Sequence, residues 1–266
     1  MAGNKIGVIG MGVVGQAVAK GFAPYYQVLA YDTHSKRTKC KYNELRQAEL
    51  IFVCVPTLNI GHQQSLKHVH DAVEKLHALP YTGLVILKST VLPGTTADLE
   101  HHYPALKIIH NPEFLSEATA GVDFAAQKKV ILGGQARHFP LAEAAYRKLN
   151  AGMEFIKLPS KESEMAKYIA NVFFASKVTI FNEFFDICQE HKINFNDAKE
   201  AAIHATGWIA PDHTNVPGRH GRGFGGMCFP KDLEAFLAFG PKEHLTAITA
   251  VKTSNDRLRM RERKVH

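Results

Sequence analysis

Between residue 5 and about residue 156, short apolar or β-branched runs alternate with segments of helical character. The expected strands are residues 5–9, 27–31, 50–55, 84–87, 107–109, 130–132 and 154–157. This alternation is typical of a parallel sheet whose strands are joined by crossover helices. Several runs lack polar alternation, as do strands that are covered on both faces. The sequence therefore predicts an α/β fold in which residues 1–158 form a Rossmann-type, doubly wound parallel sheet.

After Pro159 the strand pattern stops, and residues 160–192 predict one long helix. Its acidic start and basic end suit the helix dipole. Its apolar residues are so dense that it must bury more than one stripe, against the first domain or against another subunit. Shorter helices are expected at 196–204, 231–239 and 241–259. We expect residues 159–266 to form an all-helical central domain and the chain to form a homodimer through the long helix.

A glycine-rich turn follows the first strand directly and opens an apolar helix. Its sequence is Gly10-Met11-Gly12-Val13-Val14-Gly15. The first glycine permits the tight turn, the second lets a pyrophosphate reach the helix N-terminus, and the third allows close helix packing. Asp32 ends the next strand, where it would accept a hydrogen bond from a ribose 2′-hydroxyl and repel a 2′-phosphate. The turn therefore predicts NAD as the cofactor, while the nearby Lys36 and Arg37 keep NADP open.

A cysteine lies in a second glycine-rich segment, Gly223-Phe224-Gly225-Gly226-Met227-Cys228-Phe229-Pro230-Lys231-Asp232. Glycines let the backbone approach a ligand closely. Lys231, together with a helix that starts after Pro230, would favour the thiolate of Cys228 over the thiol. Cys228 is therefore a candidate nucleophile, and the alternative is a small buried apolar residue.

Composition limits the other classes of function. The four cysteines (Cys40, Cys54, Cys188 and Cys228) form no CxxC pair, so we expect reduced thiols and no zinc site. Neither the pair His68 and His70 nor the pair His101 and His102 has the i,i+4 spacing of helical zinc ligands, which favours a solvated surface and no metal. No apolar run approaches the roughly 20 residues that span a bilayer, so we expect a cytoplasmic protein without a membrane segment.

The formal net charge of +7 would attract nucleic acid, an anionic cofactor or a phosphorylated substrate alike. Part of it lies in the basic run 257–264, which is either a solvated helix end or a binding tail. Because no aromatic and basic platform accompanies this run, nucleic acid ranks last among the candidate partners.

Five further stretches, in the same order, accompany the cysteine segment. They are the glycine turn; Val55-Pro56-Thr57; Lys88-Ser89-Thr90-Val91-Leu92-Pro93-Gly94-Thr95; Asn111-Pro112-Glu113-Phe114-Leu115-Ser116-Glu117; and Glu164-Met165-Ala166-Lys167-Tyr168-Ile169-Ala170-Asn171. Together they resemble the UDP-glucose/GDP-mannose dehydrogenase family, from residue 5 to about residue 259. The resemblance implies oxidation of a sugar nucleotide's primary alcohol to a carboxylate, in two hydride transfers to two NAD molecules, through a thioester on cysteine.

The resemblance also implies a role for each matching residue. Cys228 would attack the aldehyde intermediate, and Lys167 and Asn171, four apart on one helix face, would donate hydrogen bonds to the oxyanion. Asp232, with Thr90 and a water, would accept the alcohol proton. Glu113 would activate the hydrolytic water, and Glu117 would lie one turn further on if that segment is helical.

The remaining matches are binding residues by resemblance. For the cofactor they are Gly10, Gly12, Val13, Val14, Gly15, Asp32, Val55, Pro56, Thr57, Ser89, Thr90, Glu117 and Lys231. For the substrate they are Glu113, Phe114, Leu115, Lys167, Asn171, Arg219, Arg222, Phe224 and Gly225. Arg219 and Arg222 are also phosphate candidates on chemical grounds, because a guanidinium group matches phosphate bidentately.

Five of these residues also have a structural interpretation. Lys167 and Asn171 fit a solvated helix face, and Thr90 fits a strand end. Glu113 and Glu117 fit a helix's first turn, where a carboxylate is worth under about 1 kcal/mol.

Length is the main departure from the family, whose members continue into a third domain that binds the substrate's base. We expect this chain to lack that C-terminal UDP-binding domain. The leading hypothesis is an NAD-dependent nucleotide-sugar 6-dehydrogenase, with UDP-glucose as the default substrate. One alternative is a dehydrogenase for a smaller phosphorylated or nucleotide-linked alcohol. The other is a non-catalytic NAD-binding partner of a full-length relative.

Overall fold

The computed structural model describes residues 4–263 and divides the chain into two compact units. The first comprises residues up to 60 together with 64–167, and the second comprises residues 61–63 and those from 168 onward. The division falls inside the long helix, at Lys167 and Tyr168, whereas the sequence places a domain boundary at residue 158. Lys264, at the end of the basic run, lies outside the described residues.

The first unit is built on a seven-stranded sheet in the order β2-β1-β3-β6-β7-β8-β9. Its strands are β1 (Lys5–Ile9), β2 (Gln27–Tyr31), β3 (Leu50–Val53), β6 (Leu84–Leu87), β7 (Lys107–His110), β8 (Lys129–Gly133) and β9 (Glu154–Leu158). The first five are mutually parallel, as predicted. The order reverses at β1, so a crevice for a ligand is expected beyond the carboxyl ends of β1 and β3.

Two features of the sheet differ from the sequence-based expectation. β8 pairs antiparallel to β7, with His110 opposite Gly133, and β9 is parallel to β8, so the sheet is mixed. An antiparallel neighbour needs no long crossover, and only the short α4 (Ala120–Ala126) lies between β7 and β8. A separate two-stranded sheet, β4 (Asn59–Ile60) with β5 (Gln63–Gln64), was not predicted.

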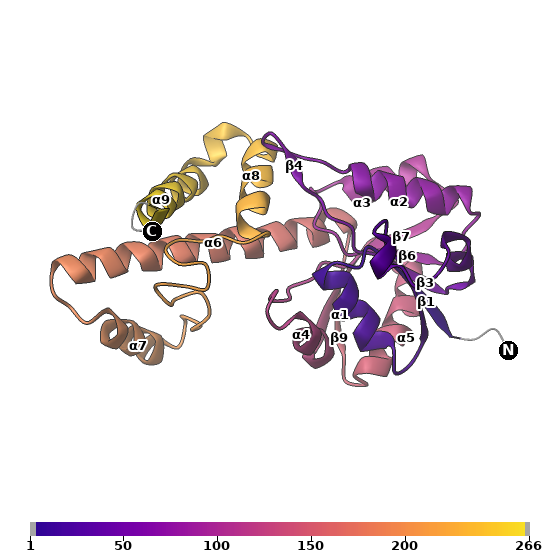
Figure 1. The fold of residues 1–266 in the computed structure, drawn as a ribbon, viewed down its shortest axis with the longest axis horizontal. Helices are drawn as coiled ribbons and strands as arrows, with labels where there is room; N and C mark the ends of the chain where they lie inside the picture. The colour runs from indigo at the N-terminus through magenta and orange to yellow at the C-terminus, as the bar shows by residue number, and fades with distance from the viewer. Residues whose placement is uncertain (1–3, 264–266) are drawn as a thin grey trace. The chain divides into compact units, whose positions relative to one another are not determined.

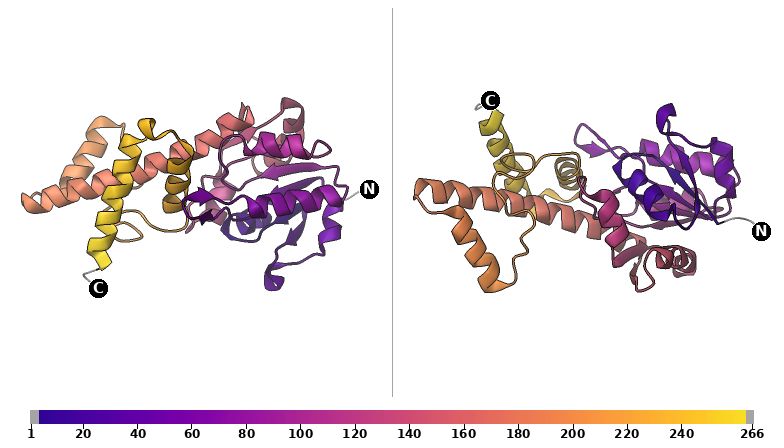
Figure 2. Two further views of the ribbon diagram at one scale, coloured as in Figure 1. Left: turned by 90° about the horizontal axis from the view of Figure 1, so that it is seen from above. Right: turned by 60° about the horizontal axis from the view of Figure 1, so that its bottom comes forward.

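Helices cover both faces of the main sheet, as Figures 1 and 2 show. α1 (Val13–Phe22), α4 and α5 (Phe139–Leu149) share one apolar core with it, in which the Phe22 ring contacts Phe52, Phe124 and Tyr146. α2 (Lys67–Ala78) and α3 (Thr95–His102) contribute to the core on the other face. Short 3-10 helices are η1 (Ser35–Arg37), η2 (Tyr42–Gln47) and η3 (Ala136–His138). The doubly wound α/β prediction is confirmed.

The second unit is built from helices. They are α6 (Ser160–Glu190), which begins in the first unit, α7 (Phe195–Thr206), α8 (Phe229–Phe239), η4 (Lys242–His244) and α9 (Thr246–Arg263). Val172 and Ala175 of α6 share a core with Phe224 and with Leu233 of α8. α9 begins at Thr246 rather than at residue 241, because Pro241 precedes a separate 3-10 turn. None of the helices in the described part of the chain is both long and apolar enough to cross a membrane.

Candidate functional site

The glycine turn between β1 and α1 has the geometry that a dinucleotide requires. Gly10 has φ +89°, and a Cβ there would lie 2.7 Å from the Cys54 carbonyl oxygen. A Cβ on Gly15 would lie 1.9 Å from the Gly10 carbonyl oxygen. Around Gly12, by contrast, a Cβ would meet nothing within 4 Å. Two of the glycines are therefore required by packing, and the third leaves open space beside the helix.

The N-terminus of α1 is open to an anion. Gly12 is its N-cap residue and supplies no side-chain cap, so the first N–H groups, including those of Val13 and Val14, have no intrahelical partner. Asp32 follows β2, and its Oδ2 accepts a hydrogen bond from the Met11 N–H at 2.6 Å. The Asp32 carboxylate thus orders the turn from the side where a ribose would bind. These residues fit a dinucleotide pyrophosphate and its ribose.

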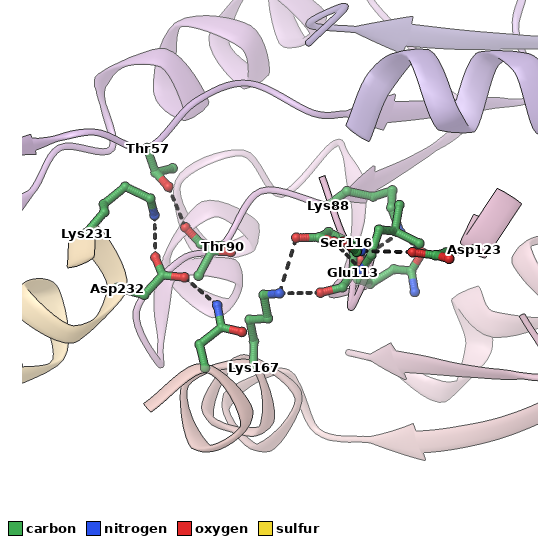
Figure 3. A network of polar contacts seen from close by, with 12 residues as sticks. Thr57, Lys88, Thr90, Glu113, Ser116, Asp123, Lys167, Lys231 and Asp232 are labelled. Atoms are coloured by element: carbon green, nitrogen blue, oxygen red, sulfur yellow. Dashed lines mark hydrogen bonds and ion pairs between the residues drawn. The ribbon is translucent and has the colours of Figure 1, made fainter. Parts of the chain in front are cut away.

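The loops after β3 and β6 are tied together at the same edge of the sheet. The Ser89 hydroxyl donates to the Val55 carbonyl oxygen at 2.7 Å, and the Thr57 hydroxyl donates to the Thr90 carbonyl oxygen at 2.8 Å (Figure 3). Pro56, between Val55 and Thr57 in the loop after β3, is exposed. The predicted cofactor residues of these two loops therefore lie together.

Glu113 and Lys167 form a buried ion pair. The Lys167 Nζ donates to the main-chain oxygen of Glu113 and to its Oε1 at 3.2 Å, as Figure 3 shows. The Lys167 side chain is 5% exposed, and the Glu113 side chain is 11% exposed. Phe114 is half exposed, with its ring centroid 5.1 Å from the same Nζ. The solvated-face interpretation of Lys167 is therefore wrong.

The segment from residue 111 to 116 is not helical. Glu113 instead turns its Oε2 back to accept from the Leu115 N–H at 2.7 Å, while Glu117 lies exposed in the turn before α4. The condition under which Glu117 would lie one helical turn after Glu113 is therefore not met. Pro112 disfavours helix in the residue before it, and the Asn111 side chain is bonded to β8 and α5.

A buried lysine that sequence analysis did not assign supports the Glu113 segment. The Lys88 Nζ donates to the side-chain Oδ1 of Asn111 at 2.9 Å and to its main-chain oxygen at 3.2 Å. The Tyr146 hydroxyl donates to the same Oδ1 at 2.5 Å, and the Asn111 amide donates to Ile131 of β8. Burial lowers the pKa of Lys88 to about 8. Lys88 and Asn111 both stand in stretches that carry the resemblance, and that signal could have found them.

A cavity of about 220 Å³ lies beside this network. Its lining includes Lys88, Asn111, Glu113, Phe114, Leu115 and Phe124. Three of these residues, Glu113, Phe114 and Leu115, were predicted to bind substrate.

His110 was also missed, because the expected strand stopped at residue 109. It is fully buried, its Nδ1 lies 2.8 Å from the Ser163 hydroxyl of α6, and burial lowers its pKa to about 3. His110 is therefore neutral and holds the first turn of α6 against the sheet. A Cβ on Gly133 would lie 2.2 Å from the Ser163 Cβ, so this contact is closely packed.

In the second unit, the first turn of α8 gathers three predicted residues. Cys228 is exposed and is the N-cap residue of the helix, and its carbonyl oxygen accepts from the Asp232 N–H at 2.9 Å. The buried Asp232 carboxylate accepts from the Asn171 amide at 2.6 Å and from the Lys231 ammonium (Figure 3). The buried-residue interpretation of Cys228 and the solvated-face interpretation of Asn171 are both wrong.

The segment before Cys228 separates the two predicted arginines. The Arg222 guanidinium donates to the Asn182 Oδ1 at 2.8 Å and pairs with Asp186 at 2.5 Å, so α6 takes up most of its donors. Arg219 is exposed in the tight turn where Gly218 and Gly221 pair.

The other two predicted substrate residues of this segment are held by local packing. Phe224 is buried in the core of the unit. Gly225 lies against the His220 side chain, because a Cβ added to Gly225 would lie 3.1 Å from the Cβ of His220.

Within residues 4–263, no three His, Cys, Asp or Glu side chains are grouped to hold a metal ion.

Comparison with known families agrees with this geometry. Residues 27–150 match the model of the UDP-glucose/GDP-mannose dehydrogenase family's NAD binding domain, and residues 161–257 match the model of its central domain. The chain belongs to the UDP-glucose/GDP-mannose dehydrogenase family. The family's NAD-binding domain confirms NAD as the cofactor. The matched region begins at residue 27, so the role of the glycine turn depends on its own geometry.

Individual relatives agree with the family assignment. The UDP-glucose 6-dehydrogenase of Rickettsia conorii is 32% identical over 231 residues, which cover 83% of this chain and 52% of that protein. The structure of a UDP-glucose dehydrogenase from Pyrobaculum islandicum superposes with a TM-score of 0.84 at 25% identity, over 96% of this chain and 68% of that one. The chain spans about half the length of the curated relatives that it matches.

A further likeness concerns the fold alone. Mycobacterium tuberculosis 3-hydroxyisobutyrate dehydrogenase superposes with a TM-score of 0.74 at 17% identity, over 95% of this chain and 91% of that one.

Proposed function

We propose that the chain oxidises the primary alcohol of a nucleotide sugar to a carboxylate, with UDP-glucose as the default substrate. The observation that carries the proposal is the first turn of α8, where exposed Cys228 precedes the buried Asp232 held by Asn171 and Lys231. Bound NAD would accept one hydride in each of the two oxidation steps. The family assignment and the open N-terminus of α1 support that cofactor.

In the first oxidation, Asp232 accepts the proton of the alcohol, with Thr90 as the second group that orients the hydroxyl. Two donors hold the Asp232 carboxylate, which fixes the direction of its oxygens. A base that is held in place is what proton transfer requires. The product of this step is an aldehyde.

In the second oxidation, the Cys228 sulfur attacks the aldehyde carbon and a C–S bond forms, while the carbonyl oxygen gains a proton. Loss of a hydride and of that proton leaves a thioester. Water then adds to the acyl carbon, and Glu113 takes one of its protons. The C–S bond breaks to leave the thiolate and a carboxylic acid, which loses its remaining proton to solvent as the carboxylate is released.

Lys167 and Asn171 stabilise the oxyanion of these steps. An ammonium has three donors and an amide has two. Lys167 uses two donors on Glu113, and Asn171 uses one on Asp232, so each retains one for the substrate. Hydrogen-bond donors held in advance at the site of developing charge contribute about 3 kcal/mol each to lowering the barrier.

For the substrate's phosphates we propose Arg219, which is exposed, whereas the donors of Arg222 go to α6. The cavity beside Glu113, Phe114 and Leu115 is proposed as part of the sugar pocket.

We also propose a homodimer through α6. This helix carries a stripe of exposed apolar side chains: Ile169, Phe173, Ile180, Phe184 and Ile187. They are between 46% and 63% exposed. Spacings of three, four and seven residues place them on one face, and covering such a face stabilises a dimer. We propose a cytoplasmic location, since none of the four cysteines forms a disulfide and the mechanism needs a reduced thiol.

The test follows NADH formation with a panel of sugar nucleotides, beginning with UDP-glucose. Two NADH for each acid formed supports the four-electron oxidation, whereas no NADH with any of them contradicts it. The variant Cys228→Ser is expected to form no acid, and Cys188→Ser on α6 is the matched control because that thiol is half-buried and has no assigned role. Activity on small phosphorylated alcohols alone would favour a dehydrogenase for a smaller phosphorylated or nucleotide-linked alcohol. A hetero-oligomer without turnover would favour a non-catalytic NAD-binding partner of a full-length relative.

A further inference from the structure

Glu164 on α6 is fully buried and has no role in the mechanism above. Its Oε2 accepts from the Gly94 N–H at 2.6 Å. Its Oε1 accepts from the Thr96 N–H at 2.7 Å and from the Thr96 hydroxyl at 2.6 Å. No salt bridge to a cation is found for it among residues 4–263. This carboxylate is therefore held entirely by three donors at the start of α3.

The contact caps α3 from a distant part of the chain. Gly94, the N-cap residue of α3, has φ +108° and no side chain with which to cap the helix. Glu164, which lies 70 residues further along the chain than Gly94, accepts the Thr96 N–H that a capping side chain would otherwise take, and also the N–H of Gly94 itself. A carboxylate at a helix N-terminus is also favoured by the helix dipole. The capped helix follows directly on the segment that carries Thr90.

One stretch of α6 holds both loops that carry proposed catalytic groups of the first unit. Glu164 holds residues 94–96, and Thr57 holds the other end of the same loop at the Thr90 carbonyl oxygen. Lys167, three residues after Glu164, holds both the main chain and the carboxylate of Glu113. Residues three apart lie on the same helix face. The spacing between the Thr90 loop and the Glu113 loop is thus set through one rigid helix turn.

We propose that Glu164 is a positioning residue, which holds the Thr90 loop in register with Lys167 and Glu113. The proposal rests on the proposed function, because Thr90, Lys167 and Glu113 take their roles from it. Glu164 itself contacts no substrate. It acts through the α3 N-terminus on one side and through Lys167, on its own helix, on the other.

The decisive variant is Glu164→Gln, which keeps the side chain's shape and replaces one acceptor oxygen by a donor that faces a backbone N–H. Misplacement of a catalytic group by about 1 Å costs about 100-fold in rate, so kcat is expected to fall about 100-fold. KM for the sugar nucleotide and for NAD should stay near the wild-type values, since the groups that bind the ground state remain. Glu162→Gln is the matched control, as Glu162 lies on the same turn and is exposed. Glu164→Asp retains the charge and should recover part of kcat.

Amide hydrogen exchange of residues 90–102 in the intact chain gives a readout that does not need activity. The Gly94 and Thr96 amides are expected to be protected in the wild type and to exchange faster in Glu164→Gln, with no change in Glu162→Gln. If the wild type oxidises no sugar nucleotide, the proposed function fails, while the exchange result still decides whether Glu164 holds the loop. Unchanged exchange in Glu164→Gln, or faster exchange with wild-type kcat, would overturn the positioning role. A Glu164→Gln chain that does not fold is replaced by Thr96→Val, which removes only the hydroxyl bond and should show the same changes at a smaller size.

Discussion

Two regions that carry the proposed chemistry are constructed differently. In the first unit, Glu113 and Lys167 are buried, and Asn111 and Lys88 lie behind them in a network of side-chain hydrogen bonds. In the second unit, Cys228 is exposed at the end of a helix, and only the carboxylate behind it is buried. A buried pair requires both partners for stability, whereas an exposed nucleophile does not. Substitutions in the first region should therefore affect folding and activity together, and those in the second mainly activity.

The largest expected effect is on activity. Asp232→Asn keeps the size of the side chain and removes the proposed base, so NADH formation should fall about 10³-fold. The urea midpoint should fall as well, because Asp232 is buried against Lys231 and Asn171, but by less than in Lys167→Met, since the Lys231 side chain is 19% exposed and can be hydrated. Asp212→Asn, in the exposed loop before Arg219, is the matched control and should match the wild type in both measurements. Asp232→Asn with near wild-type turnover would remove the base from the second region.

Lys167→Met should affect both properties. It leaves the Glu113 carboxylate buried without its partner, so the free energy of unfolding is expected to fall by about 3 kcal/mol, in addition to the loss of turnover. The comparison pair is Lys129 with Glu154, both of which are 66% exposed. Lys129→Met should cost less than about 1 kcal/mol. Urea denaturation of both variants measures the difference, and equal costs would contradict the contrast between the regions.

The glycine turn separates packing from binding within one motif. Gly15→Ala places a methyl group in the Gly10 carbonyl oxygen, and overpacking of this kind costs about 1–3 kcal/mol of stability. The methyl group of Gly12→Ala would have no neighbour within 4 Å, so the thermal midpoint of this variant should stay at the wild-type value. Its NAD affinity should fall, because the methyl group fills the space for the pyrophosphate. Calorimetric titration with NAD and thermal unfolding test both. An unchanged affinity in Gly12→Ala would place the pyrophosphate elsewhere.

The smallest effect is a pH dependence from Lys88. The pKa of Lys88 is about 8 in the folded chain, against the ordinary lysine value of 10.5 in the unfolded chain. Between these two pH values the unfolded chain binds more protons than the folded chain, so the free energy of unfolding rises with pH. Below pH 8 both states are protonated, and the cost of burying the cation is constant. The rise attributable to Lys88 from pH 7 to pH 9 should be about 1 kcal/mol.

Lys88→Met should lose this rise, whereas Lys107→Met, at an exposed residue, should keep it. Cys54 and Glu113 face Lys88, together with Lys167 and His110. Burial raises the pKa of Cys54 to about 12 and lowers that of His110 to about 3, so neither titrates between pH 7 and pH 9 in the folded chain. Their titration in the unfolded chain is common to the wild type and both variants, so the difference between Lys88→Met and the wild type measures Lys88. Urea midpoints at pH 7 and pH 9 measure this rise in stability for each variant. If Lys88→Met shows the same rise as the wild type, the rise comes from another group.

The sequence predicted local features well and the contacts between distant segments poorly. Apolar runs and glycine spacing located every strand of the main sheet, and the turn before α1 has the expected open N-terminus. The direction of β8 was missed because a short apolar run has no polarity of its own. Arg222 illustrates the same limit. Its guanidinium pairs with Asp186, which lies 36 residues away, and no pattern near Arg222 indicates that contact.

Sequence alone determined the doubly wound fold, the NAD-binding family and the residues that carry the resemblance, because periodicity, glycine spacing and motif order are local properties of the chain. Only the tertiary structure decided which polar residues are buried together. Lys88, His110, Tyr146 and Glu164 have their partners between 23 and 70 residues away. Burial of such groups is stable only when each finds a hydrogen-bond partner, and that condition is met by the folded chain as a whole.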